Sequence, residues 1–120
     1  MGKDFKNALQ MVKDVYDKGG WIVAGTDGPI IPFGMSLHLE LESYAAAGLP
    51  NAAVLKTATY DAARLLNAAA DLGSIEVGKL ADLIILDANP LEDIKNLRKM
   101  DKVILNGRVL TLQDLLSPKR

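Results

Sequence analysis

The sequence has no cysteine and only one histidine, His38. Without cysteine the chain forms no disulfide bond and has no thiolate chemistry, which is consistent with a cytoplasmic protein. A self-contained zinc site normally takes three or four nitrogen, sulfur or oxygen ligands. A chain with one histidine is therefore short of ligands for a metal site of its own.

The sequence also lacks a long apolar run and an excess of charge of one sign. No stretch approaches the roughly 20 apolar residues that cross a bilayer, and the first residues do not resemble a signal peptide. The 14 basic and 15 acidic residues leave a net charge of -1 over 120 residues. This balance favours neither nucleic acid nor an anionic membrane surface as a partner. We expect a globular protein of one-domain length.

The first part of the chain predicts a helix followed by a buried strand. Apolar residues recur at helical spacing over 4–18, and Gly19-Gly20 ends the pattern. Residues 21–26 begin with the apolar run from Trp21 to Ala24 and show no alternation, which is typical of a parallel strand covered on both faces. This order is the helix-to-strand half of an α/β repeat. A strand of this kind needs parallel neighbours, and no similar run follows closely.

The rest of the chain divides near Asp71. Before it, small residues dominate three predicted helices: one over about 37–47 with Ser36 as N-cap, one beginning near Asn51, and one capped by Thr59. After it, the pattern predicts a strand over 83–86 and a hairpin over 102–110 around an Asn-Gly pair. We therefore expect two units, residues 1–71 and a mostly-β unit over 72–120.

Five segments in this order resemble the metal-dependent amidohydrolases. They are "AGTDGP", "LHLELESYAAAGL", "ATYDAARLLN", "LGSIEVGKLADLIILDANPLEDI" and "VILNGRVL". Each segment alone is a weak signal, but five in register from about residue 20 onward are specific. The "TDGP…LHLELE" pattern is most similar to the imidazolonepropionase-like and prolidase-like branch.

The resemblance implies an α/β fold that is incomplete in this chain. Such enzymes have a (β/α)₈ barrel, the TIM barrel, flanked by a β-sandwich. Residues 1–71 would then hold the last helix-to-strand step of the barrel, strand eight, and the helices after it. Residues 72–120 would hold the C-terminal share of the sandwich. A barrel takes about 250 residues, so we expect the C-terminal part of a larger hydrolase: a gene fragment, an incomplete reading frame or an isolated segment.

The candidate site follows from the same resemblance. Asp27 matches the aspartate at the end of strand eight, which implies a metal ligand and general base at the catalytic end of the barrel. Gly25 and Gly28 would allow close approach of the backbone, and Pro29 would stiffen the loop. The alternative is a turn aspartate that bonds its own backbone.

The neighbouring polar residues are weaker candidates. Thr26 and His38 would lie near the site and steady the Asp27 loop without binding the metal, and His38 does not match a metal histidine of the family. Glu40 and Glu42 lie two residues apart and point in different directions on a helix, so we interpret them as solvated.

Two hypotheses about function remain open. In the first, the complete protein is a metal-dependent hydrolase, with zinc the expected metal, that cleaves carbon–nitrogen bonds of amides or cyclic amides in a small-molecule substrate. Asp27 would act there, while this chain alone would lack both metal and activity. In the second, the chain is a self-associating α/β fragment without ligand chemistry. Under either hypothesis we expect a protein partner, because strand 21–26 would have unpaired edges. This partner would be the missing N-terminal barrel portion or further copies of the same chain.

Overall fold

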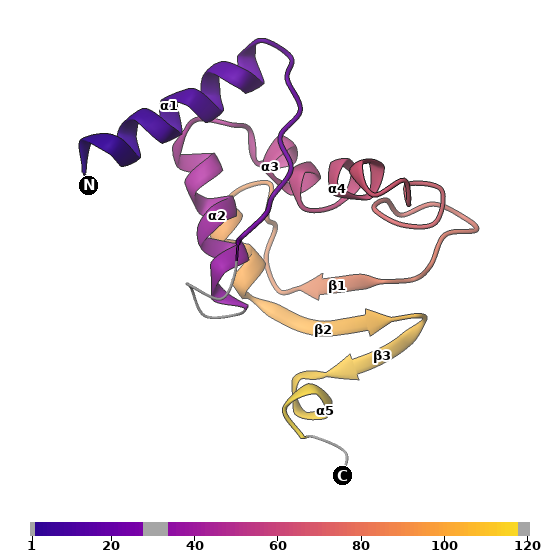
Figure 1. Cartoon of the computed structure of the whole chain (residues 1–120). Helices are drawn as coiled ribbons and strands as arrows, with labels where there is room; N and C mark the ends of the chain where they lie inside the picture. Colours follow the sequence, from indigo (N-terminus) through magenta and orange to yellow (C-terminus); the bar gives the residue numbers. More distant parts are fainter. Residues whose placement is uncertain (1, 28–33, 118–120) are drawn as a thin grey trace.

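A computed structural model describes residues 2–27 and 34–117 of the chain. Its elements follow in the order α1 (Lys3–Asp17), α2 (Met35–Ala46), α3 (Asn51–Thr57), α4 (Tyr60–Leu65), β1 (Leu83–Leu86), the 3₁₀ helix η1 (Ile94–Arg98), β2 (Met100–Leu105), β3 (Arg108–Thr111) and α5 (Leu112–Leu116). The first four helices lie on one side of a small sheet, and α1 projects away from it (Figure 1). No helix in the described ranges is long and apolar enough to cross a bilayer.

The predicted first helix is confirmed as α1. It is followed by a turn in which Gly19 has a positive φ of 75°. Only part of its apolar stripe reaches other elements: Val12 and Tyr16 pack against the core, while Phe5 and Val15 are exposed. A helix with this much uncovered apolar surface is unusual for a monomeric protein. Most of the apolar stripe of α1, apart from Val12 and Tyr16, therefore has no packing partner within the described residues.

The predicted strand at 21–26 is not a strand in this structure. A strand must pair its backbone groups with a neighbouring strand. Here the Ala24 N–H donates instead to the carbonyl of Thr57, at 3.0 Å, and the Gly25 N–H donates to the Glu40 side chain. Residues 20–27 run past α2 and α3 without a strand neighbour among the described residues (Figure 1).

The helices after this segment form as predicted, but neither of the two predicted cap side chains, Ser36 and Thr59, bonds the start of its helix. Helix α2 begins after Gly34, whose φ of 87° suits glycine, and Ser36 lies inside the helix, where it is buried. The prediction of Ser36 as N-cap is therefore wrong. Thr59 does precede α4, but its hydroxyl donates to the carbonyl of Leu55 rather than capping the helix.

The predicted strand at 83–86 and the predicted hairpin at 102–110 are confirmed, and together they form a three-stranded antiparallel sheet in the order β1-β2-β3. Asn106 and Gly107 both have positive φ, 48° and 78°, as a tight hairpin turn between β2 and β3 requires. The Asp82 carboxylate accepts the Asn106 N–H at 2.7 Å, which ties this turn to the start of β1. The capped helix α5, which the pattern did not predict, follows β3.

The core joins the helices to the chain that carries the sheet. Buried residues from the first half meet two residues of η1 in one cluster: Leu41, Leu49, Val54, Ile94 and Leu97. An ion pair between Arg98 and Glu42, with a nitrogen-to-oxygen distance of 2.7 Å, crosses the same junction. Division of the chain near Asp71 stays a prediction.

The position of the core predicts that replacing two valines by alanine lowers the free energy of unfolding by different amounts. Val54→Ala removes a fully buried side chain, and we expect it to lower the free energy of unfolding by roughly 1.5 to 3 kcal/mol. Val77→Ala is the matched control, because Val77 is fully exposed and should change it by less than about 0.5 kcal/mol. Urea unfolding followed by circular dichroism measures both. Equal losses would contradict this assignment of the core.

Two glycines with positive φ allow a second matched comparison. A Cβ on Gly73 would lie 2.7 Å from the Cβ of Ala63 and 3.0 Å from the carbonyl oxygen of Thr59, whereas a Cβ on Gly107 would meet nothing within 4 Å. We expect Gly107→Ala to cost about 1 to 2 kcal/mol from φ alone. Gly73→Ala should cost about 1 to 3 kcal/mol more, from overpacking. The same unfolding assay tests this order, and the reverse order would exclude close packing of Gly73 on α4.

Candidate functional site

Asp27 is the last described residue of the segment that follows α1, and it is exposed. Its φ of 46° places it in the left-handed region, which non-glycine residues seldom occupy and which aspartate tolerates better than most. Its carboxylate makes no hydrogen bond or ion pair with the described residues. Gly28 and Pro29, which complete the predicted motif, lie outside the described residues.

A carboxylate on α2 holds the backbone two residues before Asp27. The Gly25 N–H donates to Oε1 of Glu40 at 2.9 Å. The Tyr44 hydroxyl, one turn further along α2, donates to the same oxygen. The interpretation of Glu40 as a solvated surface residue is therefore wrong, because half-buried Glu40 links α2 to the segment that ends at Asp27.

The environment of this pair changes the acidity of the tyrosine. Burial raises the pKa of Tyr44 above its ordinary value of 10.0, and its hydrogen bond to Glu40 and the negative charge there raise it further. The other carboxylate oxygen, Oε2 of Glu40, is buried and has no hydrogen-bond partner among the described residues. One signal in the sequence pointed to this pair: Glu40 and Tyr44 are four residues apart, so they share a helix face.

Thr26 and His38, the two supporting residues predicted from the sequence, occupy different elements. Thr26 precedes Asp27 and is half-buried, whereas His38 is half-buried on α2. Residues two apart on a helix point about 200° away from each other, so His38 does not share the face of Glu40 that meets Gly25. A supporting role for either residue stays a prediction.

The described residues do not assemble a metal site by themselves. No three histidine, aspartate or glutamate side chains come together within residues 2–27 and 34–117. Among the described residues, Asp27 thus belongs to no group of three such ligands. A metal at this position would need ligands from outside these residues, since a protein site usually takes at least three.

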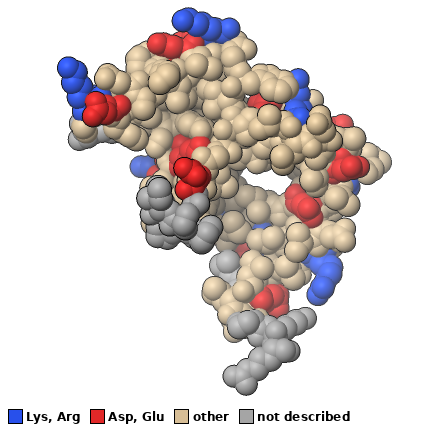
Figure 2. Space-filling model, viewed as in Figure 1, with Lys and Arg blue, Asp and Glu red and all other residues tan. Residues whose placement is uncertain are grey.

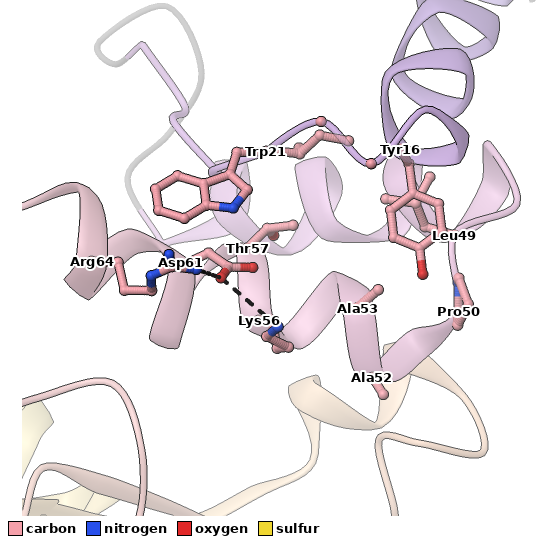
Figure 3. A pocket seen from close by; sticks show the side chains of 13 residues that line it. Tyr16, Trp21, Leu49, Pro50, Ala52, Ala53, Lys56, Thr57, Asp61 and Arg64 are labelled. Carbon is pink, nitrogen blue, oxygen red and sulfur yellow. Dashed lines mark ion pairs between the residues drawn. The ribbon is translucent and has the colours of Figure 1, made fainter. Parts of the chain in front are cut away.

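A separate pocket of about 450 Å³ lies at the other end of segment 20–27 (Figure 3). Arg64 stacks on the indole of Trp21, with the guanidinium carbon 3.7 Å from the ring centroid. Lys56 and Arg64 each lie 3.9 Å from the Asp61 carboxylate. These are long, partly exposed ion pairs, and such pairs contribute little to stability. Trp21 is six residues before Asp27, so this pocket is distinct from the candidate site.

The raised pKa of Tyr44 predicts a dependence of stability on pH. The folded chain holds the phenolic proton more tightly than the unfolded chain, whose tyrosine ionises near 10.0. The tighter binding of this proton adds to the free energy of unfolding. The added stability is complete below about pH 10 and is lost as the pH rises above that value. Tyr44→Phe should therefore show a smaller fall in unfolding free energy above pH 10. Urea titrations over this range measure it, and identical falls in both proteins would contradict the buried Tyr44–Glu40 contact.

Known proteins are similar to most of this chain, and three of them illustrate the match. A 5-methylthioadenosine/S-adenosylhomocysteine deaminase of Caldanaerobacter subterraneus is 32% identical across 82% of this chain and 28% of the enzyme. An imidazolonepropionase of a Geobacillus species is 30% identical across 82% of this chain and 24% of the enzyme. The crystal structure of a Xaa-Pro dipeptidase with bound methionine superposes with a TM-score of 0.80 at 37% identity, over 86% of this chain and 25% of that one.

These comparisons establish the family and the extent of the match. The chain spans less than a third of the length of each of these three relatives. The predicted resemblance to imidazolonepropionase-like and prolidase-like enzymes is confirmed, since an imidazolonepropionase and a Xaa-Pro dipeptidase are among the relatives. The sequence profile of the amidohydrolase family matches residues 2–110. This chain therefore belongs to the amidohydrolase family.

Proposed function

We propose that this chain is the C-terminal part of a metal-dependent hydrolase that cleaves carbon–nitrogen bonds, with Asp27 as a metal ligand and general base. The observation that carries the proposal is the position of Asp27. It is an exposed carboxylate in a left-handed conformation at the end of segment 20–27, within the part of the chain that matches the family. Rare backbone conformations of this kind occur preferentially at active sites.

The proposed placement in the fold makes α1 and segment 20–27 the last helix-to-strand step of a (β/α)₈ barrel. Two kinds of surface support it. Trp21, Leu37 and Leu39 are exposed around the segment and α2, although their side chains are large and apolar. Residues 20–27 also lack a strand neighbour among the described residues. A barrel would supply a parallel strand on each side of the segment and cover both of its faces.

A second apolar surface supports the proposal that residues 72–120 share a composite sandwich. A groove of about 610 Å³ lies between the helices and the sheet, lined by apolar residues that include Leu66, Leu72, Ile84 and Val103. Figure 2 shows the opening between these two parts of the molecule. We propose that the occupant is the N-terminal remainder of the same enzyme, because the chain spans only 24 to 30% of its relatives.

Amidohydrolases generally depend on a metal, and Asp27 is the described residue that fits one. It offers carboxylate oxygens free of other partners among the described residues. A bound divalent cation such as zinc would supply the Lewis acidity that activates water. The Asp27 carboxylate would help to hold that cation, and as a general base it would take up a proton and pass it to the departing nitrogen. The substrate class proposed is a small amide, cyclic amide or dipeptide.

A chimaera tests this proposal. Residues 2–117 replace the matching segment of the Xaa-Pro dipeptidase, and zinc content and hydrolysis of a Xaa-Pro dipeptide are measured. We expect a folded chimaera that holds zinc and hydrolyses the dipeptide. Asp27→Asn should lower hydrolysis by at least about 100-fold and reduce zinc content, because it removes a ligand and base.

Asp4→Asn is the matched control, since Asp4 is exposed in the first turn of α1. It should leave zinc content and hydrolysis unchanged. A folded chimaera in which Asp27→Asn retains both zinc and hydrolysis would refute the role of Asp27. A chimaera that cannot fold would refute the placement in the barrel.

The second candidate function, self-association of the chain, is favoured by the same exposed apolar surfaces. Sedimentation of the chain alone distinguishes self-association from the proposed role as part of a hydrolase. A stable monomer at high concentration would exclude self-association, whereas a dimer that dissociates when the dipeptidase remainder is added would support the barrel as the preferred partner.

A further inference from the structure

We infer that Glu40 is a positioning residue for Asp27, acting through its hydrogen bond to the backbone of Gly25. This inference rests on the proposed function, in which Asp27 is a metal ligand and base. The contact joins residues 15 positions apart in the chain and lies two residues before Asp27. It is the point at which α2 can set the path of the backbone into the site.

The segment needs such support because little else holds it. Among the described residues, two backbone N–H groups next to each other anchor its end: Ala24 to the carbonyl of Thr57, and Gly25 to Glu40. Asp27 follows in a left-handed conformation, which costs free energy and persists only where neighbouring contacts determine the backbone. A hydrogen bond to an ionised carboxylate is about twice as strong as one to a neutral acceptor. Of the two anchors, the one at Gly25 lies closer to Asp27.

Glu40 is itself held in place, as a positioning residue must be. The Tyr44 hydroxyl donates to the same oxygen that receives Gly25. The next residue, Leu41, belongs to the buried core, and Glu42 pairs with Arg98 of η1. The position of Glu40 is thereby coupled to the core through one turn of α2.

The contacts of Glu40 indicate how it acts. Glu40 accepts the backbone N–H of Gly25 and the hydroxyl of Tyr44, and no hydrogen bond joins it to Asp27 among the described residues. Support therefore passes through the hydrogen bond to Gly25. Only Oε1 of Glu40 makes these contacts, and Oε2 has no hydrogen-bond partner among the described residues. A glutamine keeps one carbonyl oxygen of the same shape, which makes Glu40→Gln a conservative variant.

The test compares Glu40 with Glu42 in the chimaera. Glu40→Ala should lower kcat and the affinity for zinc by roughly 10- to 100-fold with KM within about twofold, as expected of a residue that orients a metal ligand. Glu40→Gln should recover most of this loss. Glu42→Ala is the matched control on the same helix. It removes only a partly exposed ion pair and should change kcat by less than about twofold.

A readout in the full 120-residue chain needs no activity. The amide proton of Gly25, observed by ¹⁵N-resolved nuclear magnetic resonance, should exchange at least about tenfold faster in Glu40→Ala. It should remain protected in Glu40→Gln and in Glu42→Ala. Unchanged Gly25 exchange in Glu40→Ala would overturn the inference, because the hydrogen bond would then not hold this segment.

The two proposals fail in distinguishable ways. If Asp27→Asn retains zinc and hydrolysis in the folded chimaera, the proposed function fails, whatever Glu40 does. If Asp27→Asn loses both while Glu40→Ala keeps kcat and zinc affinity, the inference about Glu40 fails alone. A loss in Glu40→Ala that Glu40→Gln does not recover would also overturn it, since charge and not hydrogen bonding would then be responsible.

Discussion

The apolar contact between the α2–α3 region and the short helix η1 is the constraint on which the rest of this structure depends. Val54 is fully buried there, beside Leu41 from α2 and Ile94 and Leu97 from η1. Removing these side chains from water is the main favourable term for a chain that has no disulfide bond. Because η1 connects β1 to β2, this contact also places the sheet relative to the helices.

The candidate site inherits its geometry from that core. Helix α2 is held by Leu41 on its buried side, and the same turn presents Glu40 to the backbone of Gly25. Asp27 then lies just beyond the anchored part of the segment. The proposed role of Asp27 would need a fixed backbone behind it, because small displacements of a catalytic group are costly in rate. In this chain the support comes from a helix, and not from a strand neighbour among the described residues.

How far the sequence could predict this arrangement differs from element to element. The helical stripe of α1, the apolar run of β1 and the Asn106-Gly107 turn are local patterns, and each forms as predicted. The strand at 21–26 does not form, since strand pairing depends on partners that the local pattern cannot reveal. Ser36 is a residue type that often caps helices. In the structure, however, Gly34 is the residue before α2, and Ser36 is buried inside the helix.

The amino-acid sequence by itself determined the family and the helical and hairpin segments, and it predicted Asp27 as a metal ligand. Its motifs and periodicities are local, so they can be recognised without knowing which elements contact each other in the folded chain. Only the tertiary structure decided that Glu40 contacts Gly25 and that η1 completes the core of the helices. These contacts join residues far apart in the chain, and burial and hydrogen bonding between such residues arise only once the elements pack.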